Sequence, residues 1–198
     1  MSDILKTAAN NLLSNLQPIE IKTFSIKIED IRKAMITENT WFAKERAEGC
    51  LGKLFKDLDK INKGDCLYWY ETENEEIAKQ MVIDLNNFRE ANNKYKGEKK
   101  YRSLSAKGKP RNIDSKVLYV GTVKHRNRKD GLTTIGSRTF QHLGFYDKGS
   151  TGALHLWYWA KYSVKLNVIE LPGDLSDYRN VFEKLLAIEL KPLIGVHR

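Results

Sequence analysis

Cysteine is scarce in this sequence: only Cys50 and Cys66 carry a thiol among 198 residues. The two positions lie far apart and form no Cys-x-x-Cys pair. A protein that relies on disulfides, or on a pair of redox-active thiols, would show closely spaced or more numerous cysteines. We therefore interpret both thiols as structural and expect the protein to occupy the reducing cytoplasm.

Long hydrophobic runs are also missing, because no stretch approaches the ~20 apolar residues that a membrane span needs. We therefore predict no membrane partner. The first 17 residues lack both the continuous apolar core and the small-residue cleavage site of an export signal. Their apolar residues repeat at helical spacing, which predicts an amphipathic helix. These residues are Ile4, Leu5, Ala8, Leu12, Leu13 and Leu16.

Acidic residues are nearly absent from one basic window. Between Lys94 and Lys129 the sequence has 13 Lys and Arg but only Glu98 and Asp114, an excess of 11 in a chain of net charge +9. Such a concentration favours a polyanion, most simply nucleic acid, over a positive loop without a ligand. The residues we expect to contact the nucleic-acid backbone are Lys99, Lys100, Arg102, Lys107, Lys109, Arg111, Lys124, Arg126, Arg128 and Lys129.

The strongest strand signal lies inside this window, directly before its last group of basic residues. Residues 117–123 form a nearly continuous apolar run, which is typical of a strand covered on both faces. Tyr119 places a hydroxyl group within the run, where a buried phenol needs a partner. Gly121 is typical of a bulge or of a close approach by another backbone or a ligand. Because the positive loop begins at Lys124, the junction indicates a site.

The rest of the chain alternates between helical and strand patterns. We predict a strand over 19–26, helices between 28 and 61 with a break near Gly49, a strand over 66–70, a helix over 74–94, a basic loop over 99–111, a helix from Thr134 or Ser137 to Gly144, a strand over 164–171 and a helix over 176–190. Residues 153–162 are aromatic and fit either a helix or a strand.

The order of five polar residues resembles the GIY-YIG nuclease family. In that family two tyrosine-bearing strands precede a helical arginine, which some members follow one turn later with a histidine, and a metal-binding glutamate lies on the last helix. The corresponding residues are Tyr68 in Cys66-Leu67-Tyr68, Tyr119 in Tyr119-Val120-Gly121, Arg138, His142 and Glu183. Glu183 also precedes Pro192 by nine residues, as the family's glutamate precedes a proline.

The sequence departs from the family pattern in three places. Cys66 replaces the glycine of the first motif, and Gly195 stands where an asparagine often follows the proline. Tyr68 and Tyr119 are 51 positions apart, where the family usually has a short hairpin. The resemblance therefore covers roughly residues 63–195, with an insertion at about 71–115.

The resemblance implies an α/β fold and two regions of the chain. We expect a small central sheet of three strands, mixed or antiparallel, that is flanked by helices. Residues 1–62 would form a mainly helical N-terminal extension, and residues 63–198 would form the GIY-YIG-like nuclease domain with its basic insertion.

The resemblance also implies a metal-dependent endonuclease that cuts DNA. Phosphodiester hydrolysis needs an activated water, neutralisation of the developing charge and help for the leaving oxygen. Glu183 suits Mg²⁺ or Mn²⁺, which keeps most of its waters, and Arg138 offers a fork of donors to a phosphate. Tyr68, Tyr119 or His142 could orient or deprotonate the water, and we favour Tyr68 as the base.

Several alternatives stay open at this stage. Glu189 falls within the apolar stripe of the last helix and is a rival metal ligand to Glu183. Family members of similar length include restriction enzymes, so a type II restriction-like homodimer is our first hypothesis. A catalytically silent nucleic-acid-binding module, or a nuclease acting on RNA or on branched DNA, would show the same charge pattern.

Overall fold

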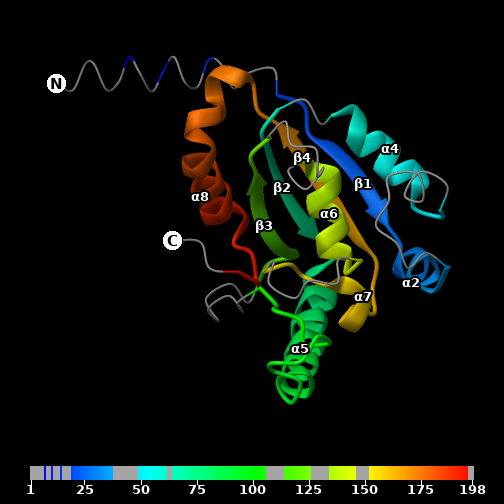
Figure 1. Cartoon of the computed structure of the whole chain (residues 1–198). Helices are drawn as coiled ribbons and strands as arrows, with labels where there is room; N and C mark the ends of the chain where they lie inside the picture. The colour runs from blue at the N-terminus through cyan, green and yellow to red at the C-terminus, as the bar shows by residue number, and fades with distance from the viewer. Residues whose placement is uncertain are drawn as a thin grey trace.

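A computed structural model describes residues 19–37, 49–61, 64–105, 114–125, 134–145 and 152–195, together with the single positions 7, 10 and 14. In chain order the elements are β1 (Lys22–Ile26), α2 (Ile28–Thr37), α4 (Gly52–Lys60), β2 (Cys66–Glu71), α5 (Glu75–Asn93), β3 (Val117–Val123), α6 (Ile135–Leu143), α7 (Leu156–Trp159), β4 (Val164–Glu170), the 3-10 helix η2 (Gly173–Tyr178) and α8 (Arg179–Leu190) (Figure 1).

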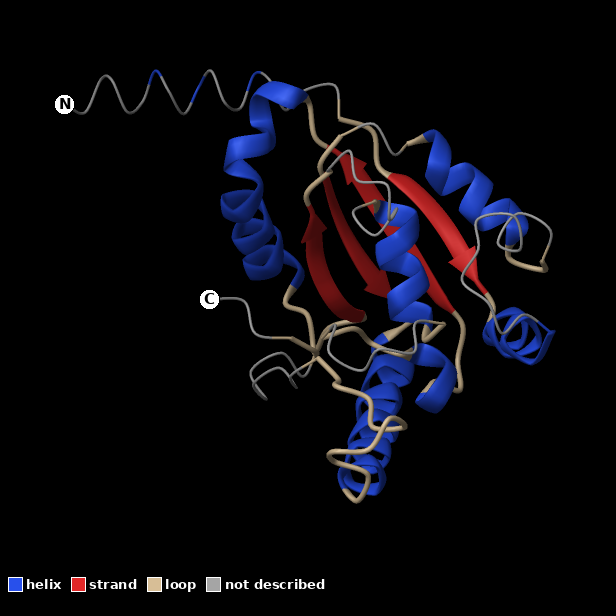
Figure 2. Cartoon of the chain, viewed as in Figure 1, coloured by secondary structure: helices blue, strands red, loops and turns tan. Residues whose placement is uncertain are grey.

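These elements surround a four-stranded antiparallel sheet in the order β1-β4-β2-β3 (Figure 2). The α/β class is thus confirmed, and the three predicted strands are neighbours. The expected count of three is corrected to four, because β1 pairs with β4 from Lys22 opposite Val168 to Ile26 opposite Val164. The alternating sequence of β1 predicts a strand, but its partner strand lies far away along the chain, with Lys22 opposite Val168.

The two faces of the sheet are covered by different helices. Side chains alternate along a strand, so β2 directs Tyr68 and Tyr70 to one face and Leu67 and Trp69 to the other. Tyr68 and Tyr70 belong to the main core, to which α6 contributes Phe140. Figure 1 shows α6 in front of the sheet and α8 alongside β3. On the second face, α8 and η2 pack against Leu67 and Trp69.

The predicted helix ends of α5 and α6 are confirmed. Asn74 accepts a hydrogen bond from the backbone N–H of Ile77 at 2.9 Å, which satisfies an exposed donor of the first turn of α5. Thr134 caps α6 in the same way, through Ser137. Gly144 ends α6 with φ 102°, a left-handed conformation that glycine adopts without a Cβ clash. In the described part of the chain, no helix is both long and apolar enough to cross a membrane.

The described N-terminal residues belong to the main core. Ile26 of β1, Ile31 of α2 and Phe55 of α4 lie in the same buried cluster as Tyr68. These residues therefore complete the sheet and its core. The predicted boundary near residue 62 stays a prediction.

The last helix differs from its predicted apolar side. Phe182 and Ala187 are buried against the sheet, whereas Val181, Leu185 and Ile188 are 50%, 55% and 70% exposed. In the sequence, the apolar residues on two sides of α8 form one broad stripe. In the structure, only one of these sides contacts the sheet. Glu189, which the pattern places within that stripe, is exposed.

Candidate active site

Four of the five predicted catalytic residues meet on one face of the sheet. Tyr68 on β2 and Tyr119 on β3 lie on neighbouring strands, with ring centroids 6.2 Å apart. Arg138 and His142 project from α6 toward them. The ring centroid of His142 is 5.5 Å from that of Tyr68 and 4.9 Å from that of Tyr119. These four residues, far apart in the sequence, therefore form a spatial cluster.

The phenolic oxygen of Tyr68 is the centre of this cluster. It accepts a hydrogen bond from Nε of Arg138 at 3.1 Å and lies 2.9 Å from Nε2 of His142. The backbone N–H of Leu154 donates to Nδ1 of His142 at 3.1 Å, so Nδ1 carries no proton. In the neutral ring Nε2 must then carry the proton, and its N–H donates a hydrogen bond to the oxygen of Tyr68. Two N–H donors consequently point at one phenolic oxygen.

His142 is neutral in this position. Its side chain is fully buried, and burial lowers its pKa well below the usual range, with the charges of Arg138 and then His155 acting in the same direction. A ring that is buried, neutral and hydrogen-bonded at both nitrogens has no lone pair available for a water. His142 therefore acts on Tyr68 and does not serve as the base.

Arg138 keeps its charge at all relevant pH values. Burial lowers the pKa of its guanidinium, but the neighbouring phenols of Tyr68 and Tyr119 outweigh burial, so the pKa of Arg138 is raised overall. Its Nη1 also donates to Oε1 of Gln141 at 2.7 Å, which fixes the plane of the guanidinium. Arg138 and Tyr119 are half-buried, so they form the outer surface of the cluster.

Tyr68 is a neutral phenol in the resting protein. Burial raises its pKa above the usual range, Tyr119 raises it further, and Arg138 opposes both. Its side chain is 1% exposed. The site therefore combines a donor arrangement that favours the phenolate with a burial that disfavours it.

Glu183 lies on α8, on the opposite side of β3 from Tyr68. It is half-buried, one turn before Ala187, which packs against Val120 of β3. One turn of helix advances about 6 Å, nearly the length of two strand residues. Ser115, just before β3, donates to the carbonyl of Leu190 at the end of α8, so α8 runs antiparallel to β3 and Glu183 lies further toward the end of β3 than Ala187 does. Glu183 and Tyr68 therefore belong to opposite faces of the sheet at its β3 edge, and Glu183 is the one predicted catalytic residue outside the Tyr68 cluster.

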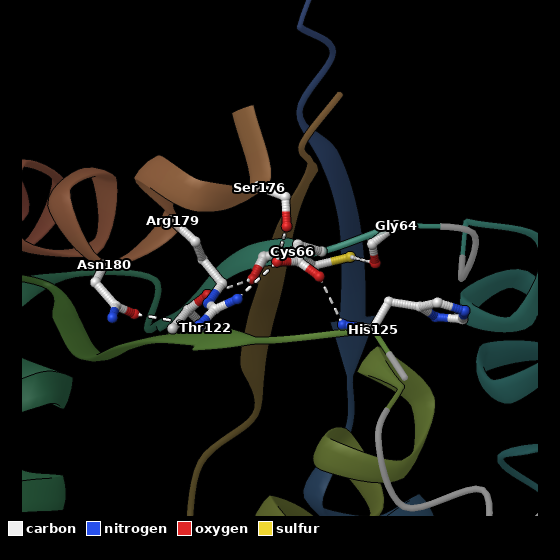
Figure 3. A network of polar contacts seen from close by, with 8 residues as sticks. Gly64, Cys66, Thr122, His125, Ser176, Arg179 and Asn180 are labelled. Carbon is white, nitrogen blue, oxygen red and sulfur yellow. Dashed lines mark hydrogen bonds and ion pairs between the residues drawn. The ribbon is translucent and has the colours of Figure 1, made fainter. Parts of the chain in front are cut away.

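A buried ion pair that the sequence pattern did not reveal fixes the start of α8. The carboxylate of Asp65 accepts hydrogen bonds from the backbone N–H of His125, Oγ of Ser176 and Nη1 of Arg179, each at 2.7 Å (Figure 3). Burial raises the pKa of Asp65, but these donors outweigh it and the pKa is lowered.

The Asp65 network has a direct consequence for the site. Asp65 precedes Tyr68 by three residues, and Arg179 precedes Glu183 by four. The ion pair therefore fixes the helix of the candidate metal ligand against the strand of the candidate base. Residues 63–65 indicate only a turn in the sequence, and nothing local to them or to Arg179 signals their pairing.

The predicted nucleic-acid contacts fall into three groups. Lys99, Lys100 and Lys124 are exposed. Arg102 is used internally, because Nε donates to the hydroxyl of Tyr158 at 3.0 Å and Nη1 to the carbonyl of Lys99 at 2.8 Å. The remaining predicted contacts lie outside the described residues, namely Lys107, Lys109, Arg111, Arg126, Arg128 and Lys129.

After α5, the basic window contacts the backbone next to the candidate site. Leu104 forms a parallel bridge with Ala153, and Ser105 donates its N–H to the carbonyl of Ala153 at 3.3 Å. Ala153 directly precedes Leu154, whose N–H binds His142. The end of this basic segment is therefore joined to the backbone beside His142 of the candidate site.

Among the described residues, no group of three or more His, Cys, Asp or Glu is placed to hold a metal ion. Comparison of the chain with models of known protein families, with curated proteins and with solved structures gives no match. Any assignment of function therefore rests on the chemistry of the site.

Proposed function

We propose that the protein is a divalent-metal-dependent endonuclease that hydrolyses DNA phosphodiester bonds with a site of the GIY-YIG type. The observation that carries the proposal is the pair of N–H donors, from Arg138 and His142, that meet at the oxygen of Tyr68. Hydrogen bonds to the charged form of a group favour that form. A phenol that only filled the core would need one partner, whereas a base must hold a negative charge.

Each residue of the cluster then has one role. In its phenolate form Tyr68 takes a proton from the attacking water and becomes a phenol, and His142 holds its ring in place. Arg138 stays charged and neutralises the phosphate as negative charge develops on it. Tyr119, at the surface of the cluster, orients the water. This assignment keeps Tyr68 as the base and makes His142 a positioning residue.

The donor chemistry of Glu183 fits Mg²⁺ or Mn²⁺. A hard cation of this kind needs only one or two protein carboxylates, because waters and phosphate oxygens supply its other ligands. A half-buried single carboxylate near the β3 edge of the sheet meets that need, and Glu189 is exposed. When bound there, the ion would neutralise the phosphate and assist the leaving oxygen.

Charge supports nucleic acid as the substrate. Lys99, Lys100 and Lys124 are exposed within the basic window, and the window carries more than the entire net charge of the chain. Backbone contacts of this type bind DNA without reading its sequence. A type II restriction-like enzyme, acting in the cytoplasm as a homodimer with one site per chain, remains our first hypothesis for its biology.

The decisive experiment is cleavage of a defined plasmid with Mg²⁺ or Mn²⁺, compared with EDTA, followed by sequencing of the ends. Discrete ends indicate restriction, and scattered nicks argue against it. Glu183→Ala should lower cleavage by about 100-fold or more while the gel shift persists. Glu189→Ala, an exposed change on the same helix, is the control. Equal cutting by Glu183→Ala and the wild type would remove Glu183 from the mechanism.

A catalytically silent nucleic-acid-binding protein of the same fold is the second candidate. The burial of Tyr68 favours it, because a base must reach a water and only 1% of this side chain is exposed. A gel shift without nicking at any metal concentration would support this candidate. Parallel reactions on structured RNA and forked DNA test whether the substrate is a nucleic acid other than plasmid DNA.

A further inference from the structure

The side of α8 that faces away from the sheet carries an apolar stripe. Tyr178, Val181, Leu185 and Ile188 are 47%, 50%, 55% and 70% exposed. Tyr178 directly precedes the first residue of α8, and the spacing of three, four and three residues places all four side chains along one face of the helix. We call these four residues the outer face of α8. A contiguous apolar helix face of this kind marks a contact surface.

The chain before β1 leaves the fold beside this surface. Ile19 packs against the cluster that contains Phe182, in the first turn of α8. The preceding segment, residues 4–16, has the apolar periodicity of an amphipathic helix. Thr7, Asn10 and Ser14 are helical and exposed, at the spacing of a single polar face. The sequence periodicity then predicts that the apolar residues of the segment share the opposite side of the helix.

The two apolar faces match in length. Leu5 and Leu16 would be about 17 Å apart along a helix, and the outer face from Tyr178 to Ile188 extends about 15 Å. Three extended steps from Leu16 to Ile19 reach about 11 Å, which is enough for the 8–10 Å between packed helix axes. Pro18 favours an extended conformation at Gln17 and so ends the helix before this connection.

We propose that residues 4–16 pack as a helix on the outer face of α8 of the same chain, antiparallel to it. In this arrangement Leu16 lies near Val181, Leu12 near Leu185, and Ala8 near Ile188. The short connection to Ile19 makes the contact intramolecular and gives the segment a high effective concentration at α8. This pairing is independent of the nuclease chemistry.

Engineered cysteines test the pairing directly. The background is Cys50→Ser, because Cys50 is exposed, whereas burial raises the pKa of Cys66 to about 12 and makes its thiol unreactive. Leu12→Cys with Leu185→Cys should form an intramolecular disulfide under mild oxidation at low protein concentration. Ser14→Cys with Leu185→Cys is the matched control, because Ser14 is on the polar face. The first pair should react at least about tenfold faster.

Peptide mapping and non-reducing gels distinguish the outcomes. A faster intramolecular bridge at Leu12 supports the proposal. Equal rates for the two pairs overturn it, and a dimer band from the Leu12 pair shows that a second copy occupies α8 and also overturns it.

An independent measurement uses two exposed isoleucines. Ile188→Ser should lower Tm by about 4 °C because the segment covers this side chain, whereas Ile83→Ser on α5, where Ile83 is 50% exposed, should not. Equal shifts in the two variants would show that Ile188 is uncovered and would contradict the pairing.

Discussion

The phenol of Tyr68 lies directly over Gly121 on the neighbouring strand. A Cβ at position 121 would lie 2.6 Å from Oη of Tyr68 and 2.7 Å from an aromatic carbon of Tyr119. The glycine is thus needed because two tyrosine side chains occupy the space above it. The sequence indicates a close approach to Gly121, and the groups that approach it are the side chains of Tyr68 and Tyr119.

Gly121→Ala should displace Tyr68 from its two donors. Because the new methyl group overpacks a buried contact, we expect a loss of about 1–3 kcal/mol in the free energy of unfolding and a larger loss of cleavage. Gly173→Ala is the control, since a Cβ there meets nothing within 4 Å. Chemical unfolding and plasmid cleavage measure both effects. Unchanged stability and activity in Gly121→Ala would contradict the described packing.

Cleavage should rise with pH through the neutral and weakly alkaline range. Burial raises the pKa of Tyr68, so the phenolate fraction increases about tenfold per pH unit below that pKa. Tyr119 raises the pKa of Tyr68 further, and Tyr119→Phe should therefore shift the rate profile to lower pH. The measurement is kcat/KM against pH. Tyr68→Phe should abolish cleavage, and a wild-type profile in that variant would exclude Tyr68 as the base.

The folded protein should lose stability in mild acid because of two buried histidines. Burial lowers the pKa of His155 to about 4 and that of His142 well below its usual range. Above pH 6.5 both rings are neutral in the folded and unfolded states. As pH falls from about 6.5 to 4, only the unfolded chain gains these protons, so stability falls by about 1.4 kcal/mol per pH unit for each histidine.

His155→Asn isolates one of these contributions. The backbone at position 155 has φ 53°, which asparagine tolerates, and neither ring nitrogen of His155 has a hydrogen-bond partner among the described residues. Between pH 6 and 5 the dependence of stability on pH, measured by urea unfolding, should be about half as steep as in the wild type. An identical slope would show that His155 does not titrate on unfolding.

Asp65→Asn should be strongly destabilising. The change removes a charge that is 5% exposed and leaves Arg179, 16% exposed, without its ion pair. We expect a loss of about 3 kcal/mol, and weaker cleavage because α8 is no longer fixed near β2. Asp57→Asn, which removes an exposed pair with Lys60, should leave stability unchanged. Similar unfolding curves for the two variants would refute the role of Asp65.

The exposed and the internal basic residues should behave differently on substitution. Replacing Lys99 and Lys100 with alanine should weaken DNA binding and reduce the slope of log K against log salt by about 2, with Tm unchanged. Arg102→Ala should instead lower Tm, because Arg102 binds Tyr158 and the carbonyl of Lys99. Salt titrations and thermal unfolding separate the two roles. The reverse pattern would place Arg102 on the DNA.

Local signals in the sequence predicted most elements correctly. Asn74 and Gly144 mark helix ends because their side chain, or its absence, satisfies the backbone there. The order of Tyr68, Tyr119, Arg138 and His142 also predicted residues that the structure brings together. These features depend on neighbours in the chain or on a recurring order of motifs, and both can be read without coordinates.

Long-range pairing could not be predicted in the same way. Nothing near Asp65 indicates Arg179, which lies 114 residues away, and nothing near Arg102 indicates Tyr158. The apolar residues of α8 illustrate the same limit, because periodicity does not tell which side meets the sheet. Charge alone likewise does not distinguish a lysine that meets solvent from an arginine that binds its own protein.

The pairing of β1 with β4 matters for anyone who prepares the protein in fragments. A fragment of residues 63–198 would leave the outer side of β4 with a row of unsatisfied N–H and C=O groups. We expect copies of such a fragment to associate edge to edge through β4. Residues 22–26 thus cover the outer side of β4, and an assay of cleavage should retain them.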